Sequence, residues 1–267
     1  MRSKFDLAAA LTTLRSNKNE MFDALLIEAI DASNLFAVKH LLSAGANPNL
    51  ETKNGETALQ LAARNGRTHI VKVLMEGGAA LDVANKDGST ALHEAATYGY
   101  SEVAMLLVEG GAALDVLDKD GYTALHTAAT YGYSEFVVLL VEAGVAIDAP
   151  NKYGETALHI AASGSHADLT RLLLAMGAEI DAQNKNGYTP LHNAAARGHT
   201  NIVKLLVEMG GMIDVPNKYG ETALHWAAST GHAEMANVLR GSPVARRYNR
   251  PGTPTSISDI WRALGLK

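Results

Sequence analysis

Ten histidines are the residues of this chain best suited to metal binding or catalysis. His93 is followed by Glu94, which matches the first half of HExxH, a zinc motif in which two imidazoles one helical turn apart hold the metal. Thr97 stands where the second histidine is required. The motif is therefore incomplete, and the pair needs another explanation.

The stretch that holds this pair is copied along the chain. TALHEAATYGYSE at 90–102 returns as TALHTAATYGYSE at 123–135, with Thr127 in place of Glu94. Other copies carry Leu61, Ile160, Asn193 and Trp226 at the same position. The histidine recurs while the residue after it varies, so the His-Glu pair is an accident of one variable position.

Glycines recur at a fixed interval and divide the chain into equal units. Six of them are 33 residues apart, at Gly55, Gly88, Gly121, Gly154, Gly187 and Gly220. Most units carry two further glycines, as at Gly99 and Gly111, and glycine tolerates the positive φ that turns and helix C-caps need. Each unit is therefore predicted to contain a turn, a helix, a stop, a helix and a stop. One turn is expected to differ locally, because Gly164 comes one place early and Ser165 takes the usual glycine position.

Apolar residues between these stops follow a helical period. Leu92 and Ala96 share one face of a first expected helix, and Val103 and Leu107 share one face of a second. Thr90 lies just before the first apolar run, where an N-cap belongs. The pattern predicts a pair of short helices in every unit.

A 33-residue unit of a turn and two helices, with TALH or TPLH in the first helix, resembles the ankyrin repeat. Six units are in register, beginning at Thr52, Asn85, Asp118, Asn151, Asn184 and Asn217. An atypical unit, 19–51, precedes them and ends in LFAVKHLLSAGANPN. The resemblance implies an all-α solenoid of about seven stacked ankyrin repeats, with paired helices and β-hairpin fingers, over 19–243. Residues 1–18 are expected to add an N-terminal capping helix, and 244–267 a basic linker and a short C-terminal amphipathic helix.

The resemblance also assigns most histidines to the scaffold. In ankyrin proteins the TALH histidine is a structural hydrogen-bonding residue, and here it stands at His93, His126, His159, His192 and His225. A second family position holds His166, His199 and His232. No dinucleotide fingerprint, Walker loop or GxSxG motif occurs in the sequence. We therefore expect no enzyme activity, no metal and no cofactor.

Composition and charge limit the partners and the compartment. The formal net charge is −5 and the pI about 6.0, so nucleic acid is not an expected partner. No apolar run reaches the ~18 residues of a membrane span, so no membrane insertion is expected. The absence of cysteine suits the cytoplasm. Arg2 and Lys4 before LAAALTTL only faintly resemble a signal peptide, and export as a secreted effector stays the alternative.

Tyrosines fall at positions that the repeat does not dictate. In ankyrin proteins the finger tips and the exposed edge of the first helix form a concave recognition surface, where tyrosine supplies much contact area for few rotatable bonds. The residues expected to bind a partner are Tyr98, Tyr131, Tyr122, Tyr153, Tyr188, Tyr219, Arg64, Arg197 and Trp226. The alternative is that the tyrosines pack on neighbouring repeats. For Tyr100 and Tyr133, which replace the family's usual histidine, a structural role is at least as well supported.

A lysine recurs once in every finger, at Lys53, Lys86, Lys119, Lys152, Lys185 and Lys218. Such a spaced basic row would suit an acidic partner. The stronger interpretation is that each lysine is a solubilising tip residue, because acids such as Asp87 and Asp120 lie beside it in the sequence.

The last part of the chain differs from the repeats in charge and composition. Residues 241–267 hold five basic residues and one acid, and PVARRYNRPGTPTS has the composition of a linker. SISDIWRALGLK is predicted to form a short amphipathic helix, with Ile260, Trp261 and Leu264 apolar, that is too short to be stable alone. This helix is expected either to cap the last repeat or to dock on another molecule, or in a groove of its own or a neighbouring chain.

These features together predict a protein–protein interaction module, or adaptor, that binds an unidentified protein or peptide ligand through the concave ankyrin surface. Preorganisation is the expected mechanism, since a stacked core fixes Tyr98, Tyr122 and Tyr131 before binding. Two alternatives stay open: an inhibitor or immunity-type protein that covers the active site of a partner enzyme, and a targeting effector that uses its C-terminal tail. A monomer is expected, with self-association through the tail as the alternative.

Overall fold

The computed structural model describes residues 21–52 and 55–241. The chain divides into two compact units, Met1–Lys119 and Asp120–Lys267. Within the described residues no helix is long and apolar enough to span a membrane.

Two expected segments lie outside the part of the chain that the structure describes. One is the capping helix at 1–18. The other is the linker and helix at 244–267, which includes Ile260, Trp261 and Leu264.

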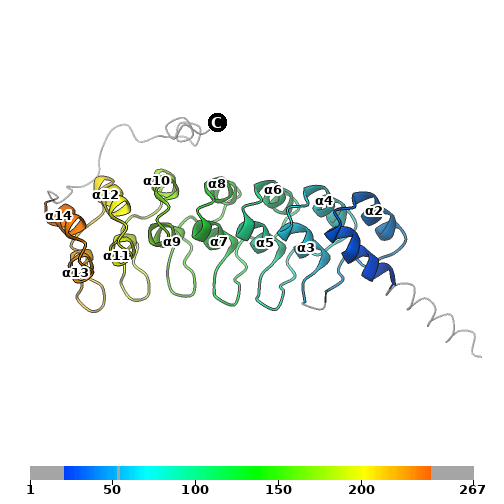
Figure 1. The fold of residues 1–267 in the computed structure, drawn as a ribbon, viewed down its shortest axis with the longest axis horizontal. Helices are drawn as coiled ribbons and strands as arrows, with labels where there is room; N and C mark the ends of the chain where they lie inside the picture. The colour runs from blue at the N-terminus through cyan, green and yellow to red at the C-terminus, as the bar shows by residue number, and fades with distance from the viewer. Residues whose placement is uncertain (1–20, 53–54, 242–267) are drawn as a thin grey trace, which may run out of the picture. The chain divides into compact units, whose positions relative to one another are not determined.

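Short paired helices make up each unit (Figure 1). In the first unit these are residues 21–31, α2 (Leu35–Ser43), α3 (Ala58–Arg64), α4 (Thr68–Glu76), α5 (Ala91–Tyr98) and α6 (Ser101–Glu109). In the second unit they are α7 (Ala124–Tyr131), α8 (Ser134–Glu142), α9 (Ala157–Ser163), α10 (Ala167–Ala175), α11 (Pro190–Ala196), α12 (Thr200–Glu208), α13 (Ala223–Ser229) and α14 (Ala233–Gly241). The predicted alternation of a first and a second helix is confirmed.

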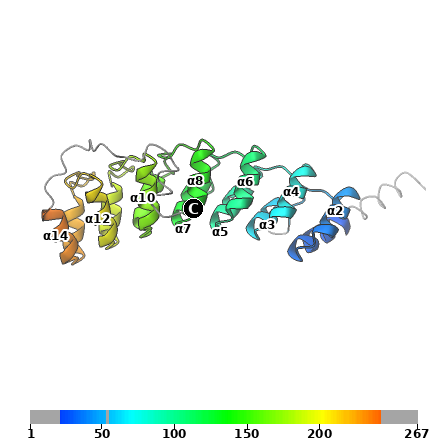
Figure 2. The ribbon, with the colours of Figure 1, turned by 90° about the horizontal axis from the view of Figure 1, so that it is seen from above.

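Each unit has two helical layers. First helices pack on first helices, as α3 does on α5 and α9 does on α11, and second helices pack on second helices, as α4 does on α6. The loops project beyond the layer of first helices (Figure 1). Seen from above, the second helices of each unit lie side by side (Figure 2). The first helices can pack closely on their neighbours because they bury small residues: Ala62, Ala95, Ala128, Ala161 and Ala194 are completely buried.

A threonine begins each first helix, as the sequence predicted. Thr156 has extended backbone angles and forms a capping box with His159, whose Nδ1 accepts a hydrogen bond from the Thr156 backbone N–H over 3.2 Å. Because Nδ1 accepts, the ring proton lies on Nε2. The same box is built by Thr90 with His93, Thr123 with His126, Thr189 with His192 and Thr222 with His225.

The second ring nitrogen of these histidines joins one repeat to the next. The Nε2 of His159 donates to the carbonyl oxygen of Tyr188 over 2.9 Å, and that of His192 to the carbonyl oxygen of Glu221 over 3.1 Å. Gln60 replaces the histidine in an earlier repeat, and its Nε2 donates to two carbonyl oxygens of the following loop. The expected structural role of the TALH histidine is therefore observed.

The loops are fixed by turns, and within the described residues the only β pairing is an isolated bridge between Glu51 and Thr57. In one finger the side-chain oxygen of Asn151 accepts from the backbone N–H groups of Tyr153 and Glu155. Neighbouring fingers are also joined directly, since the Lys185 N–H donates to the carbonyl oxygen of Tyr153 over 3.0 Å. In the part of the chain that the structure describes, the fingers are thus held by turns and backbone contacts and form no strands.

The turn at Ser165 differs less than expected. Ser165 has a φ of 63°, close to the 74° of Gly132 at the equivalent turn. The N–H of the next residue, His166, donates to the carbonyl oxygen of Ala161, just as the Tyr133 N–H donates to that of Ala128. The repeat therefore keeps its left-handed stop, and serine adopts the conformation that glycine takes elsewhere.

Candidate functional site

Two tyrosine pairs lie where the first helices end. In the first unit Tyr98 is the last residue of α5, and its ring stacks on Tyr100 with centroids 6.1 Å apart. In the second unit Tyr131 ends α7 and stacks on Tyr133 at 5.8 Å. Tyr98 is 48% exposed and Tyr131 50% exposed. Tyr98 and Tyr131 are therefore each held in place by a stacked tyrosine, while about half of each residue stays exposed to solvent.

Tyr100 has a structural role as well. Its ring lies against the turn of the preceding repeat, where a Cβ on Gly66 would come within 2.7 Å of the ring. His166 takes the same place against Gly132, and its Nε2 donates to the carbonyl oxygen of Thr130. Tyr100 thus substitutes for the usual histidine as a packing residue, while Tyr98 is the member of the pair with more exposed surface.

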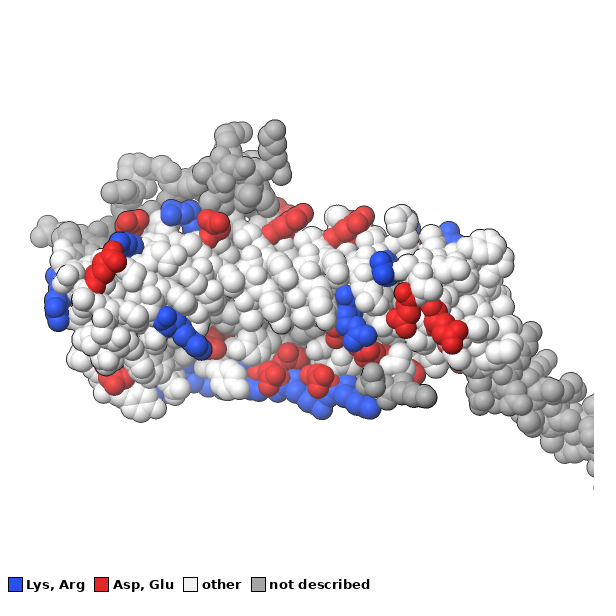
Figure 3. All heavy atoms as spheres, in the orientation of Figure 1, with Lys and Arg blue, Asp and Glu red and all other residues white. Residues whose placement is uncertain are grey.

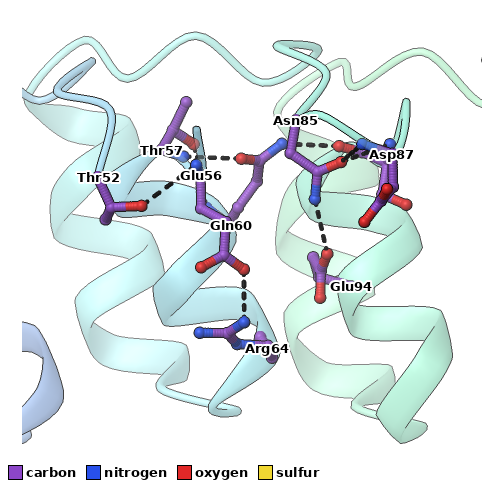
Figure 4. A network of polar contacts seen from close by, with 9 residues as sticks. Thr52, Glu56, Thr57, Gln60, Arg64, Asn85, Asp87 and Glu94 are labelled. Carbon is purple, nitrogen blue, oxygen red and sulfur yellow. Dashed lines mark hydrogen bonds and ion pairs between the residues drawn. The ribbon is translucent and has the colours of Figure 1, made fainter. Parts of the chain in front are cut away.

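Polar contacts form a network along α3, α5 and the loops before them in the first unit (Figure 4). Arg64, at the end of α3, forms an ion pair of 2.5 Å with Glu56, whose side chain is nearly buried. On α5, Glu94 accepts a hydrogen bond from the Asn85 side chain over 3.2 Å. Burial and, next, the Glu56 carboxylate raise the pKa of Glu94, while Arg64 opposes this shift. Arg64 therefore pairs with Glu56 and also offsets part of the rise in the pKa of Glu94.

A groove of about 620 Å³ adjoins this network in the first unit. Its apolar lining comes from Ala24, Ile27, Leu50 and Leu61. Its acidic lining comes from Asp23, Glu28, Asp31, Glu51 and Glu56. Thr52 and Arg64 complete the lining. Acidic groups outnumber the one basic group, so the groove suits a partner segment that carries basic and apolar side chains.

Three predicted residues of the second unit line one pocket. Tyr153, Tyr188 and Trp226 come from two loops and α13, and they surround a space of about 490 Å³. The rings of Tyr188 and Trp226 meet edge to face with centroids 6.0 Å apart. Polar groups complete the lining: Glu155, Asn184, Lys185, Asn186 and Asn193. The pocket therefore offers aromatic surface beside amide and charged groups, which is the composition of many protein-recognition sites.

The indole N–H of Trp226 is buried and has no hydrogen-bond partner among the described residues. A buried donor without an acceptor costs about 1–3 kcal/mol. The ring as a whole is partly exposed, because Trp226 lies at the edge of the pocket on α13. The Trp226 side chain is thus held by packing, against Tyr188 and against the hydrophobic core.

The remaining predicted residues have different surroundings. Tyr122 packs edge to face on His126, with centroids 5.9 Å apart, so its ring supports the scaffold. Tyr219 is 70% exposed at a loop tip, and Arg197 is exposed at the end of α11. Arg64, by contrast, is engaged by Glu56. The pocket of the second unit brings together Tyr153, Tyr188 and Trp226, while Tyr219 and Arg197 are not among the residues that line it.

Lysine and arginine side chains gather over the loop tips, with acidic side chains beside them (Figure 3). Lys152 shows how these charges are balanced: its Nζ lies 3.5 Å from Asp120 and 5.0 Å from the centre of the Tyr153 ring. Exposed pairs of this kind contribute little to stability. The contacts of Lys152 favour the interpretation of these lysines as solubilising residues.

Sequence reasoning did not single out several residues of these surfaces. The acidic groove was missed because its helix at 21–31 belongs to the atypical repeat 19–51, which lacks the TALH signature. Asn193 lies at the variable position after the TALH histidine, where Glu94 stands in an earlier repeat, and that variability was the available signal. Within the described residues, no three His, Asp or Glu side chains are grouped so that they could hold a metal ion.

Comparison with known proteins identifies the repeat. A family model described as ankyrin repeats (3 copies) matches residues 25–116, 104–184 and 167–247. No curated protein matches the chain. Among solved structures, the ankyrin repeat domain of Bcl-3, a member of the IkappaB protein family, is 30% identical with a TM-score of 0.73, and the match covers 81% of this chain and 98% of that one. The human ASB11 ankyrin repeat domain is 28% identical with a TM-score of 0.73, and the match covers 85% and 99% of the two chains.

Proposed function

Because this chain belongs to the ankyrin repeat family, we propose that it is a protein–protein interaction module that binds a partner through its loop tips and first helices. Ankyrin repeat domains in general serve as interaction modules. The partner is a protein or peptide, and the module contributes binding and no catalysis. We expect it to act inside the cell, as its lack of cysteine suggests.

The observation that carries this proposal is the half-exposed, ring-stacked tyrosine at the end of α5 and again at the end of α7. An aromatic ring that is already ordered loses little conformational freedom when a partner covers it. Such rings, placed beside well-packed surroundings, contribute disproportionately to binding free energy. Tyr98 and Tyr131 have these properties, since each is stacked on a neighbour and half exposed.

The aromatic pocket of the second unit supports the same function. Its loop residues are held by backbone contacts, because the Tyr153 carbonyl accepts from Lys185 N–H and the Tyr188 carbonyl accepts from His159. The pocket is therefore formed before any ligand arrives, and it can receive an apolar side chain of a partner while Asn193 and Glu155 offer hydrogen bonds beside it.

Two narrower functions are compatible with this one. An inhibitor or immunity-type protein would use the same face to cover the active site of a partner enzyme. A targeting effector would bind a second molecule through residues 244–267. The inhibitor differs from a simple adaptor because its binding blocks the partner's activity. The targeting effector differs because its second interaction needs residues 244–267.

Affinity capture from the native cells, followed by mass spectrometry, tests the proposal. We expect one partner to be enriched by the full chain and lost when Tyr98 and Tyr131 are replaced by alanine. Inhibition of a captured enzyme would identify the inhibitor form. Loss of a second, separate partner on deletion of 244–267 would identify the targeting form. Failure of the full chain to enrich any partner over an unrelated repeat protein would contradict the proposal.

A further inference from the structure

The last helix pair of the described residues has an open face. In the repeat before it, Leu191, His192 and Ala195 are at most 2% exposed, because α13 covers them. The residues 33 positions later are Leu224, His225 and Ala228. Leu224 is partly exposed, and His225 and Ala228 are exposed. Residues of the same types are thus buried in one repeat and uncovered in the next.

The open face keeps the composition of an internal contact. Ala63, Ala96, Ala129, Ala162 and Ala195 occupy the column of Ala228, and all are completely buried. On α14, Val238 is partly exposed, whereas its equivalent on α12, Leu205, is buried. A terminal repeat that faces water needs a polar outer surface. Leu224, Ala228 and Val238 are apolar and do not supply a polar outer surface, so we expect another segment to cover this face.

Among the described residues, His225 makes the capping hydrogen bond of its equivalents but not their hydrogen bond to a following loop. Its Nδ1 accepts from the Thr222 N–H over 3.0 Å, as in the other capping boxes. The proton therefore lies on Nε2, which in His159 and His192 donates to a carbonyl of the following loop. Within the described residues, no following loop is present beside His225. A covering segment would need to offer one carbonyl oxygen at this point.

The chain itself continues from this end. α14 closes the described part at Gly241, and residues 242–267 follow. The last twelve, SISDIWRALGLK, place Ile260 and Leu264 one helical turn apart with Trp261 beside them. A peptide of this length does not hold a helix alone and needs an apolar surface. The fourteen residues between, 242–255, reach roughly 45 Å when extended, which is ample to return across a neighbouring helix pair.

We propose that residues 256–267 of the same chain cap this face. They pack Ile260, Trp261 and Leu264 as a helix against Leu224, Ala228 and Val238, and the linker supplies a carbonyl oxygen to His225. Attachment favours this occupant over a second copy, since a short flexible linker gives an effective concentration on the order of millimolar. The tail is then part of the fold. This inference stands apart from the proposed function, because it concerns the end of the stack and not the partner face.

Hydrogen exchange of the full chain tests the cap. Replacing Trp261 and Leu264 with alanine should speed exchange in α13 and α14 by roughly tenfold or more, while α9 and α11 stay unchanged. Arg262→Ala is the matched control in the same segment and should leave exchange unchanged. Equal exchange in the double variant and the control would overturn the proposal.

A second variant tests the same contact from the other side. Ala228→Arg places a charge on the open face at an exposed position, so the repeats should still fold, and it should speed exchange within residues 256–267 themselves. Ser229→Arg, one position away and also exposed, is the control. If residues 256–267 of the unaltered chain exchange as fast as the free peptide, the proposal is wrong. Protection that grows with protein concentration would also overturn it, because a second copy would then be the cover.

Discussion

The imidazole Nε2 of His159 donates a hydrogen bond to the backbone carbonyl oxygen of Tyr188 over 2.9 Å. His159 lies in α9, and Tyr188 lies in the loop before α11, where its ring lines the aromatic pocket of the second unit. The other ring nitrogen of His159 is occupied by the Thr156 N–H. One scaffold histidine therefore closes a helix N-terminus and fixes the backbone of a candidate binding residue in the next repeat.

Replacing His159 with glutamine should preserve this connection. Gln60 occupies the equivalent position, where its Oε1 accepts from the Thr57 N–H and its Nε2 reaches the following loop. We expect His159→Gln to change the free energy of unfolding by less than about 1 kcal/mol, and His159→Ala to lower it by about 1–3 kcal/mol because buried groups lose their partners. Denaturant unfolding measures both. Equal losses in the two variants would show that the hydrogen bonds do not matter.

The same substitution should reduce sensitivity to acid. Burial lowers the pKa of His159 and of His192 below the ordinary value of about 6.5. Just below pH 6.5 the unfolded chain therefore binds more protons than the folded one, so stability falls as the pH drops and levels off below the folded pKa values. His159→Gln removes one of these groups. Its unfolding free energy should fall less between pH 7 and pH 5, and an unchanged pH dependence would contradict this account.

Arg64 should stabilise the first unit through Glu56. Glu56 is nearly buried, so Arg64→Ala leaves a carboxylate without its partner and should cost about 1–3 kcal/mol of unfolding free energy. Adding Glu56→Gln should recover part of this loss, which a double-mutant cycle measures. The removal of Arg64 should also raise the pKa of Glu94 further.

Lys204 provides the control for this pair. Its Nζ lies 2.6 Å from Glu234, but both side chains are exposed. Lys204→Ala should therefore leave stability nearly unchanged. If Lys204→Ala destabilised the protein as much as Arg64→Ala does, burial of Glu56 would not be the cause of the difference.

The finger glycines should differ in their tolerance of a side chain. Gly154 and Gly220 have nearly the same φ, 79° and 78°, so alanine carries a similar backbone cost of about 1–2 kcal/mol at both. A Cβ on Gly154 would also lie 2.7 Å from the backbone nitrogen of Lys185, whereas a Cβ on Gly220 meets nothing within 4 Å among the described residues. Gly154→Ala should therefore lower the thermal unfolding temperature more than Gly220→Ala. The same decrease in both variants would rule out the contact between fingers as a cause.

The sequence predicted the scaffold well because its constraints are local. Threonine caps, alanine faces and glycine stops each depend on a few neighbouring residues, and all appear where the 33-residue period placed them. Ser165 is the exception: the sequence predicted a different turn there, but the surrounding repeat imposes a positive φ even without glycine.

The binding surfaces were harder to predict, because they depend on the orientation of side chains and on their contacts with neighbouring repeats. Tyr122 and Tyr188 follow equivalent glycines, and both rings pack on the histidine of their own repeat. Only Tyr188 also meets a tryptophan, because Trp226 in α13 packs against it. The period gives the position of each residue but not these partners, so the sequence could not separate supporting tyrosines from pocket residues.

Titration calorimetry with the captured partner tests the central claim most directly. Tyr98→Ala together with Tyr131→Ala should weaken binding by about 30-fold or more, which corresponds to ~2 kcal/mol, while the thermal unfolding temperature stays nearly unchanged. Phe36→Ala removes an aromatic ring from α2, a second helix, that is more exposed than Tyr98 or Tyr131, and it should leave the affinity unchanged. An affinity that survives the loss of both tyrosines would contradict the assignment of this face as the recognition surface.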